Sequence, residues 1–131
     1  MEQLEEIKNW LAMFPLWGET VLTTDVLSAQ PGDCGLFPQG LELIKSTQDV
    51  LGNRVTRLRQ QFLLRRNALR GMDAAAWLLE FQNWVAQQAV MGLVPVLGQD
   101  QIVRAEKGRL IRADSAGTGV YEVRLIVEYT N

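Results

Sequence analysis

The chain has 131 residues, of which 47% are apolar and 21% charged, and its formal net charge is −2. This length and composition are typical of one globular domain, here expected over residues 1–131, and no apolar stretch is long enough to span a bilayer. Histidine is absent, which removes the commonest general base at neutral pH. No group of acids has the spacing of an all-oxygen metal site. We therefore expect no metal site and no enzyme, and a small enzyme that uses only carboxylates is the remaining chemical alternative.

The first predicted element is an amphipathic helix over residues 2–14. Leu4, Ile7, Leu11 and Phe14 recur at helical spacing, which predicts one buried face. Pro15 follows directly and predicts the end of the helix.

A short strand and a loop are expected next. Residues 20–27 are rich in β-branched side chains, which suit a strand. Residues 29–40 contain Pro31, Gly32 and Pro38, and this spacing of helix and strand breakers predicts a loop. The single cysteine, Cys34, falls in this loop and has no partner for an internal disulfide. We expect an ordinary thiol in an intracellular, reducing environment.

Residues 41–48 are predicted to form a strand, and Gly52-Asn53 to form a two-residue hairpin turn, because both residue types tolerate positive φ. Segment 54–70 would then be the returning strand. A helix is the competing interpretation, because arginine and leucine favour helices and the apolar residues also fit helical spacing. The turn and the preceding strand favour the strand.

A second helix is expected to begin with Asp73 as its N-cap and to end near Gly92 and Pro95. Its apolar stripe is predicted to contain Trp77, Phe81, Trp84, Val85 and Gln88. Residues 102–113 are predicted to be extended, with a bulge or bend at Gly108, and residues 114–119 to form a turn.

The last predicted strand has the most regular pattern. In residues 120–130 apolar and charged side chains alternate, which is typical of a half-buried antiparallel strand. The apolar face has Tyr121, Val123, Leu125, Val127 and Tyr129, and the opposite face has Glu122, Arg124 and Glu128.

These elements predict an α+β fold. A mainly antiparallel sheet of about five strands, in the order α-β-β-β-α-β-β, would pack one face against two helices. The tryptophans Trp10, Trp77 and Trp84 are expected between the helices and the sheet.

Charge is segregated along the chain. Residues 50–72 contain six arginines and no acid, whereas residues 1–49 contain eight carboxylates against two lysines. As a strand, the segment would place Arg57, Arg59 and Arg65 on one face and Arg54, Arg66 and Arg70 on the other. Three interpretations remain open: a contact between subunits, a solvated face, and a nucleic-acid site over Arg54–Arg70.

Three observations favour the contact between subunits. The chain is acidic overall, and the single aromatic residue of the segment, Phe62, is predicted on the apolar side, so no base could stack on it. The segment also uses arginine without lysine, and the planar guanidinium suits protein interfaces. The candidate interface residues are Arg54, Arg57, Arg59, Arg65, Arg66, Glu122, Arg124 and Glu128.

Several local patterns, in this order of elements, resemble a known family. The stretch Trp10-Leu-Ala-Met-Phe-Pro-Leu-Trp17, followed by Val21–Leu27 and a Pro-Gly loop, is similar to the start of small phage and prophage minor capsid proteins. These are grouped with the tail-terminator (tail-completion) proteins of siphophages. The resemblance continues through the hairpin 41–69 and the tryptophan-bearing helix, and it ends with the strand 120–130.

This resemblance implies a virion structural protein rather than an enzyme, with no catalytic residue and no cofactor. Such proteins form a homo-oligomeric ring, usually a hexamer, that ends the tail tube and joins it to the head. The implied partners are further copies of the chain, the tail tube protein and a head-completion protein. The implied location is the head–tail junction of a virion, after synthesis in the bacterial cytoplasm. A ring needs two different complementary surfaces on each subunit, and segregated charge is one way to supply them.

Overall fold

The computed structural model describes residues 2–15, 22–25, 27, 33–69, 72–106, 108–113 and 117–131. Within them the chain forms two helices and six strands, so the predicted α+β class is confirmed. The elements in chain order are α1 (Glu2–Leu11), β1 (Leu22–Thr24), β2 (Cys34–Gln48), β3 (Arg54–Leu69), α2 (Met72–Met91), β4 (Gln99–Ala105), β5 (Arg109–Ala113) and β6 (Thr118–Thr130).

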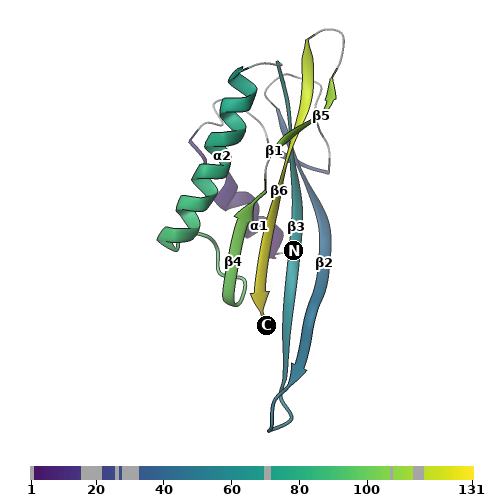
Figure 1. The fold of residues 1–131 in the computed structure, drawn as a ribbon, viewed down its shortest axis with the longest axis vertical. Coiled ribbons are helices and arrows are strands. Elements are labelled where there is room, and N and C mark those ends of the chain that lie inside the picture. The colour runs from purple at the N-terminus through teal and green to yellow at the C-terminus, as the bar shows by residue number, and fades with distance from the viewer. Residues whose placement is uncertain are drawn as a thin grey trace.

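The strands form one sheet in the order β1-β2-β3-β6-β4, with β5 also paired to β6 (Figure 1). All pairs are antiparallel except β1 with β2, which is parallel. The two centre strands, β3 and β6, pair from Arg57↔Thr130 to Leu69↔Thr118. This long register fixes which side chains of both strands share a face.

Both helices pack on one face of the sheet, as predicted. In the core, Trp10 and Phe81 are almost completely buried, and the Trp10 and Trp84 rings stack at 5.1 Å between their centroids. Phe14 meets Trp77 edge-on at 5.6 Å. The Trp10 indole Nε1 donates a hydrogen bond of 3.1 Å to Gln88 Oε1. The two helices are therefore joined by ring contacts and by one hydrogen bond between buried faces.

Segment 54–69 is a strand, so the competing helical interpretation is wrong. The predicted alternation holds: Phe62 and Leu64 lie in the core together with the apolar row of β6. The charged residues of β6 lie on the other face. In this case the pairing partners outweigh the local helix propensity of arginine and leucine.

The loop predicted over 29–40 is wrong for residues 34–40, which form the first half of β2. Its second half is the predicted strand 41–48. Pro38 lies beyond the three residues that β1 pairs, and an edge position tolerates a residue without an N–H. Gln39 is skipped in the β2–β3 register, so the pairing of β2 with β3 shifts by one residue directly after Pro38. Residues 28–32 lie outside the described residues.

The predicted two-residue turn is also wrong. Gln48 pairs with Arg54, so five residues connect β2 to β3. The Asp49 carboxylate organises this loop, because Oδ1 accepts hydrogen bonds from the backbone N of Leu51 (2.9 Å) and of Asn53 (2.8 Å). In this loop only Gly52 has a positive φ, of 88°.

The extended segment predicted over 102–113 is two strands rather than one, which makes six strands in place of five. β4 and β5 both pair with β6, along different parts of its length. Gly108 lies between them, and a Cβ atom there would come within 2.9 Å of Leu78 Cδ2 and 3.0 Å of Val123 Cγ2. Packing against α2 and β6 therefore requires glycine at this position.

Smaller differences concern the ends of elements. The first strand is shorter than predicted, only Leu22–Thr24, and Asp25 follows it with a φ of 60°; positions 20, 21 and 26 lie outside the described residues. The second helix begins at Met72, so Asp73 is inside its first turn instead of capping it. Positions 114–116 of the predicted turn are outside the described residues as well, and β6 already begins at Thr118.

The aromatic cluster gives a direct test of the core. Phe81→Ala should lower the free energy of unfolding by about 3–5 kcal/mol, because a completely buried ring is removed and a cavity remains. Urea unfolding followed by circular dichroism measures this change. The matched control is Leu79→Ala in the same helix, where the side chain is 67% exposed and the expected change is within about 0.5 kcal/mol. Equal losses in both variants would contradict this description of the core.

Candidate assembly interface

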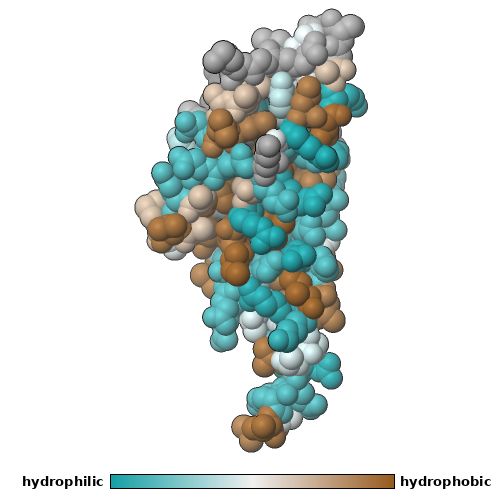
Figure 2. Space-filling model, viewed as in Figure 1, coloured by the Kyte–Doolittle hydropathy of each residue, from teal (hydrophilic) through white to brown (hydrophobic). Residues whose placement is uncertain are grey.

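The outer face of the sheet, turned away from the helices, holds a ladder of opposite charges. In the β3–β6 register Arg65 lies opposite Glu122, and Arg59 lies opposite Glu128. The strand alternation predicted from the sequence places all four side chains on this face. Figure 2, viewed from the same side as Figure 1, shows many hydrophilic residues along these strands.

Glu128 is the centre of the first group. Its Oε1 lies 2.7 Å from a terminal nitrogen of Arg59 and accepts a second hydrogen bond from Arg59 Nε at 2.8 Å. This bonding raises the pKa of the Arg59 guanidinium above its usual value. Arg57 and Arg104 lie near the same carboxylate, each at 3.8 Å. Arg57 also donates to the hydroxyl of Thr130 and to the carbonyl of Asp100.

Glu122 is the centre of the second group, and its carboxylate is 7% exposed. It accepts a hydrogen bond of 2.9 Å from Arg65 Nε and lies 3.3 Å from a nitrogen of Arg109. The Arg65 guanidinium also covers the ring of Phe37, 4.9 Å from its centroid. Two cations therefore surround one buried anion, which compensates the cost of removing it from water.

The other predicted interface residues lie elsewhere. Arg66 points to the helix side, where its guanidinium lies 4.5 Å above the Trp77 ring. Arg54 is at the far end of the β2–β3 hairpin and donates to Ser46 Oγ at 3.1 Å. Arg124 is exposed and lines a polar hollow next to Glu122. Arg70 lies outside the described residues.

We expected the arginines to meet the acids of a neighbouring copy. In the structure, carboxylates of the same chain already lie within 4 Å of Arg57, Arg59 and Arg65. Two of these carboxylates, Glu122 and Glu128, come from β6 rather than from residues 1–49. Ion pairs within the chain weaken the attraction of these arginines for phosphates or for a second subunit. The ladder therefore supports a stabilising role more directly than a docking role.

A different surface stands out as uncovered. The β2–β3 hairpin extends beyond the rest of the sheet (Figure 1). The β3–β6 pairing ends at Arg57↔Thr130 and Lys45 pairs with Arg57 on the other side, so the hairpin is two-stranded only beyond these residues. The end of the hairpin, residues 41–56, is called the arm. Every residue from Gln39 to Val55 is exposed. The arm carries six large exposed apolar side chains: Leu41, Leu43, Ile44, Val50, Leu51 and Val55.

Apolar exposure is greatest at the end of the arm. Val50 is fully exposed and Leu51 is 83% exposed, and brown atoms mark this end of the molecule in Figure 2. The turn beneath them is held by the Asp49 carboxylate and by a hydrogen bond of 2.8 Å from Asp49 N to Asn53 O. The two apolar side chains therefore project from an ordered turn. An ordered, exposed apolar group is typical of a contact surface.

The long edge of β2 is poorly suited to pairing with another strand. Its register shifts near Gln39 and near Ile44 are β-bulges, and it carries Pro38 and Lys45. Bulges, proline and lysine are the devices by which natural sheets prevent edge-to-edge pairing. The contacts that this arm can make are therefore made by its faces and by its tip.

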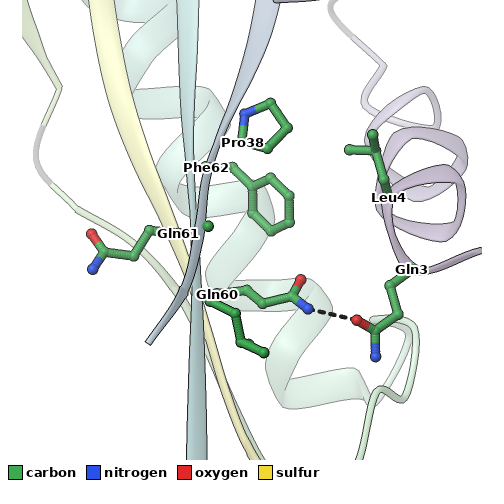
Figure 3. Close-up of a pocket in the computed structure, with 8 residues that line it drawn as sticks. Gln3, Leu4, Pro38, Gln60, Gln61 and Phe62 are labelled. Carbon is green, nitrogen blue, oxygen red and sulfur yellow. Dashed lines mark hydrogen bonds between the residues drawn. The ribbon is translucent and has the colours of Figure 1, made fainter. Parts of the chain in front are cut away.

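A cavity opens where the arm leaves the sheet. It measures about 130 Å³ and its lining is mostly apolar. The lining comes from α1 and from both strands of the hairpin: Gln3, Leu4, Pro38, Gly40, Leu41, Gln60, Gln61 and Phe62. Figure 3 shows Leu4 across the cavity from Pro38 and Phe62, with Gln60 joined to Gln3 by a hydrogen bond and the Gln61 side chain turned away.

Other kinds of site find little support in the described part of the chain. No group of three or more cysteine, aspartate or glutamate side chains is placed to hold a metal ion there. Neither described helix is long and apolar enough to cross a membrane. Cys34 is buried at the start of β2, and this burial raises the pKa of its thiol to about 12. Such a thiol stays protonated at neutral pH and is a poor nucleophile.

Comparison with known proteins adds no relative, since no protein-family model matches the chain and no curated protein matches it in sequence.

The arm and the cavity were not predicted from the sequence. One signal was present: in segment 41–55 apolar residues occupy both alternating positions, as Leu43 and Ile44 do. No second layer covers that end of the hairpin in the described structure, so both faces are exposed. The cavity depends on how α1 approaches the hairpin, and no local pattern in the sequence reports that distance.

The charge ladder predicts unequal roles for two acids that both contact arginine. Glu122→Gln should lower the free energy of unfolding by about 1–3 kcal/mol, because two cations lose a buried anionic partner. Glu42→Gln is the matched control. Its side chain is 55% exposed and lies 3.6 Å from Arg59, so we expect no measurable change. Denaturant unfolding of both variants tests this difference, and a control that loses as much stability would contradict it.

Proposed function

We propose that this protein is a structural assembly protein of a phage or prophage virion, which self-associates into a ring that ends the tail tube and joins it to the head. The observation that supports self-association best is the apolar arm, because six large apolar side chains on sixteen consecutive residues are 40–102% exposed. The tail-terminator assignment itself rests on the resemblance of the sequence patterns.

The arm has the physical character of an assembly element. An isolated two-stranded hairpin is only marginally stable in water, and exposed leucine and valine gain free energy when a partner removes them from water. A second copy of the chain supplies such a partner without any further component. An assembly role therefore accounts for the exposed apolar side chains of the arm.

The nucleic-acid alternative is weaker in this structure. A site for phosphates needs unpaired cations along one surface, whereas Arg59 and Arg65 are bonded to Glu128 and Glu122. The single aromatic residue of the segment, Phe62, is 3% exposed and offers no surface on which a base could stack.

The decisive experiment measures assembly directly. Sedimentation of the purified protein over a range of concentrations, alone and mixed with tail tubes of the same phage or prophage, should show an oligomer, with rings at tube ends in electron micrographs. A monomer at every concentration that also fails to bind tube ends would refute the proposal. The same samples, titrated with labelled DNA at low salt, should show no binding. Tight binding that weakens steeply with salt would instead support the nucleic-acid alternative.

A further inference from the structure

Two apolar features of the described residues, the tip of the arm and the cavity at its base, are complementary to each other. The tip of the arm, residues 49–53, presents Val50 and Leu51 on an ordered turn. The cavity at the base of the arm is lined by apolar groups of α1, β2 and β3. The first is a projecting group and the second a hollow, and both expose apolar surface that favours burial.

Their sizes agree. The cavity measures about 130 Å³, whereas an apolar cavity of roughly 150 Å³ in another protein holds a benzene molecule. One leucine side chain is smaller than benzene, so the Leu51 side chain fits. Leu4 and Pro38 would contact it from two sides, since they lie across the cavity from each other in Figure 3.

The tip and the surroundings of the cavity also carry opposite charges. Lys45 and Arg54 flank the tip, and the one acid between them, Asp49, is engaged with the backbone of the turn. In α1, next to the cavity residues Gln3 and Leu4, the carboxylates of Glu5 and Glu6 are exposed. The helix has three acids and one lysine, a net charge of −2. The attraction between a cationic tip and an acidic helix orients the two copies and raises the rate of their association.

The tip cannot reach the cavity of its own chain. Eight residues of β2, from Leu41 to Gln48, separate the two features and span roughly 25 Å at about 3.3 Å per residue. Contact between them therefore requires a second molecule.

We propose that the tip of the arm of one copy docks in the cavity at the base of the arm of the next copy, with Leu51 as the inserted side chain. This proposal rests on the proposed self-association and adds its interface. The two surfaces differ, so the contact is heterologous: each copy receives one tip and donates another. Such contacts produce a ring if the rotation between copies closes, and a filament if it does not.

Disulfide trapping tests the docking. Chains with Leu51→Cys and chains with Gln3→Cys are mixed, with and without tail tubes, under mild oxidation. A disulfide needs Cα atoms within about 7 Å. Each chain carries only one of the two new cysteines, so a bond between them joins two copies. We expect a mixed dimer on a non-reducing gel. The native Cys34 adds little background, because burial raises the pKa of its thiol to about 12.

The single variants serve as controls. Neither Leu51→Cys nor Gln3→Cys alone should cross-link when the contact is head-to-tail. Efficient linking of Leu51→Cys to itself would show that two tips meet, and it would overturn the proposal. Oligomers that form without any mixed dimer would overturn it too, and in that case the proposed function would stand.

A second measurement uses affinity. Leu51→Asp should raise the apparent dissociation constant for assembly by at least about tenfold, because a buried leucine is replaced by a charge. The matched control is Leu79→Asp on α2, where the leucine is also exposed and far along the chain from both surfaces; it should assemble like the native protein. Circular dichroism confirms that both variants are folded. Unchanged assembly of Leu51→Asp would refute the docking, whereas a native protein that never assembles would refute the proposed function as well.

Discussion

From Arg57 to Leu69, each residue of β3 lies opposite one residue of β6, and both faces of the sheet depend on this register. On the inner face it places Leu64 opposite Val123, where the aromatic side chains of α1 and α2 cover them. On the outer face it places Arg65 opposite Glu122. A shift by one residue would bury arginine under the helices and expose valine to water, so the core and the charge ladder stabilise the same alignment.

The sheet extends beyond the two helices that pack on it. α1 and α2 pack over the part of the sheet where β3 pairs with β6, and the hairpin continues past the last residue of that pair. The chain therefore contains a covered part, with a buried aromatic core, and an arm over which the described residues form no second layer. Hydrophobic burial stabilises the covered part, whereas the end of the arm depends on its own hydrogen bonds and on the Asp49 turn. Val50 and Leu51 at the tip are among the most exposed apolar side chains of the described residues.

Sequence patterns predicted the elements whose stability is local or strictly periodic. The alternation in residues 120–130 identified β6 and both of its faces, and the spacing of Leu4, Ile7 and Leu11 identified α1. The patterns failed where tertiary contacts decide. Pro38 indicated a loop, yet an edge strand accepts it. Gly108 indicated a bulge in one strand, but it is required by the approach of Leu78 and separates two strands.

The candidate site was predictable to a similar degree. Alternation correctly placed Arg57, Arg59 and Arg65 on one face, but it could not identify their partners, because Glu122 and Glu128 are more than fifty residues away along the chain. The cavity combines a helix from the start of the chain with a hairpin from its middle. Its existence depends on packing distance, which composition and periodicity do not report.

The bulge at Ile44 has a mechanical consequence. It lies next to Lys45, whose partner Arg57 is the last residue of β3 that pairs with β6. From Lys45 to the tip the chain spans roughly 16 Å, so a rotation of about 10° at this bulge moves the tip by roughly 3 Å. The arm acts as a lever, so a small change of backbone angle at this bulge adjusts where its end arrives. One sequence can in this way adapt to neighbours that are set at different angles.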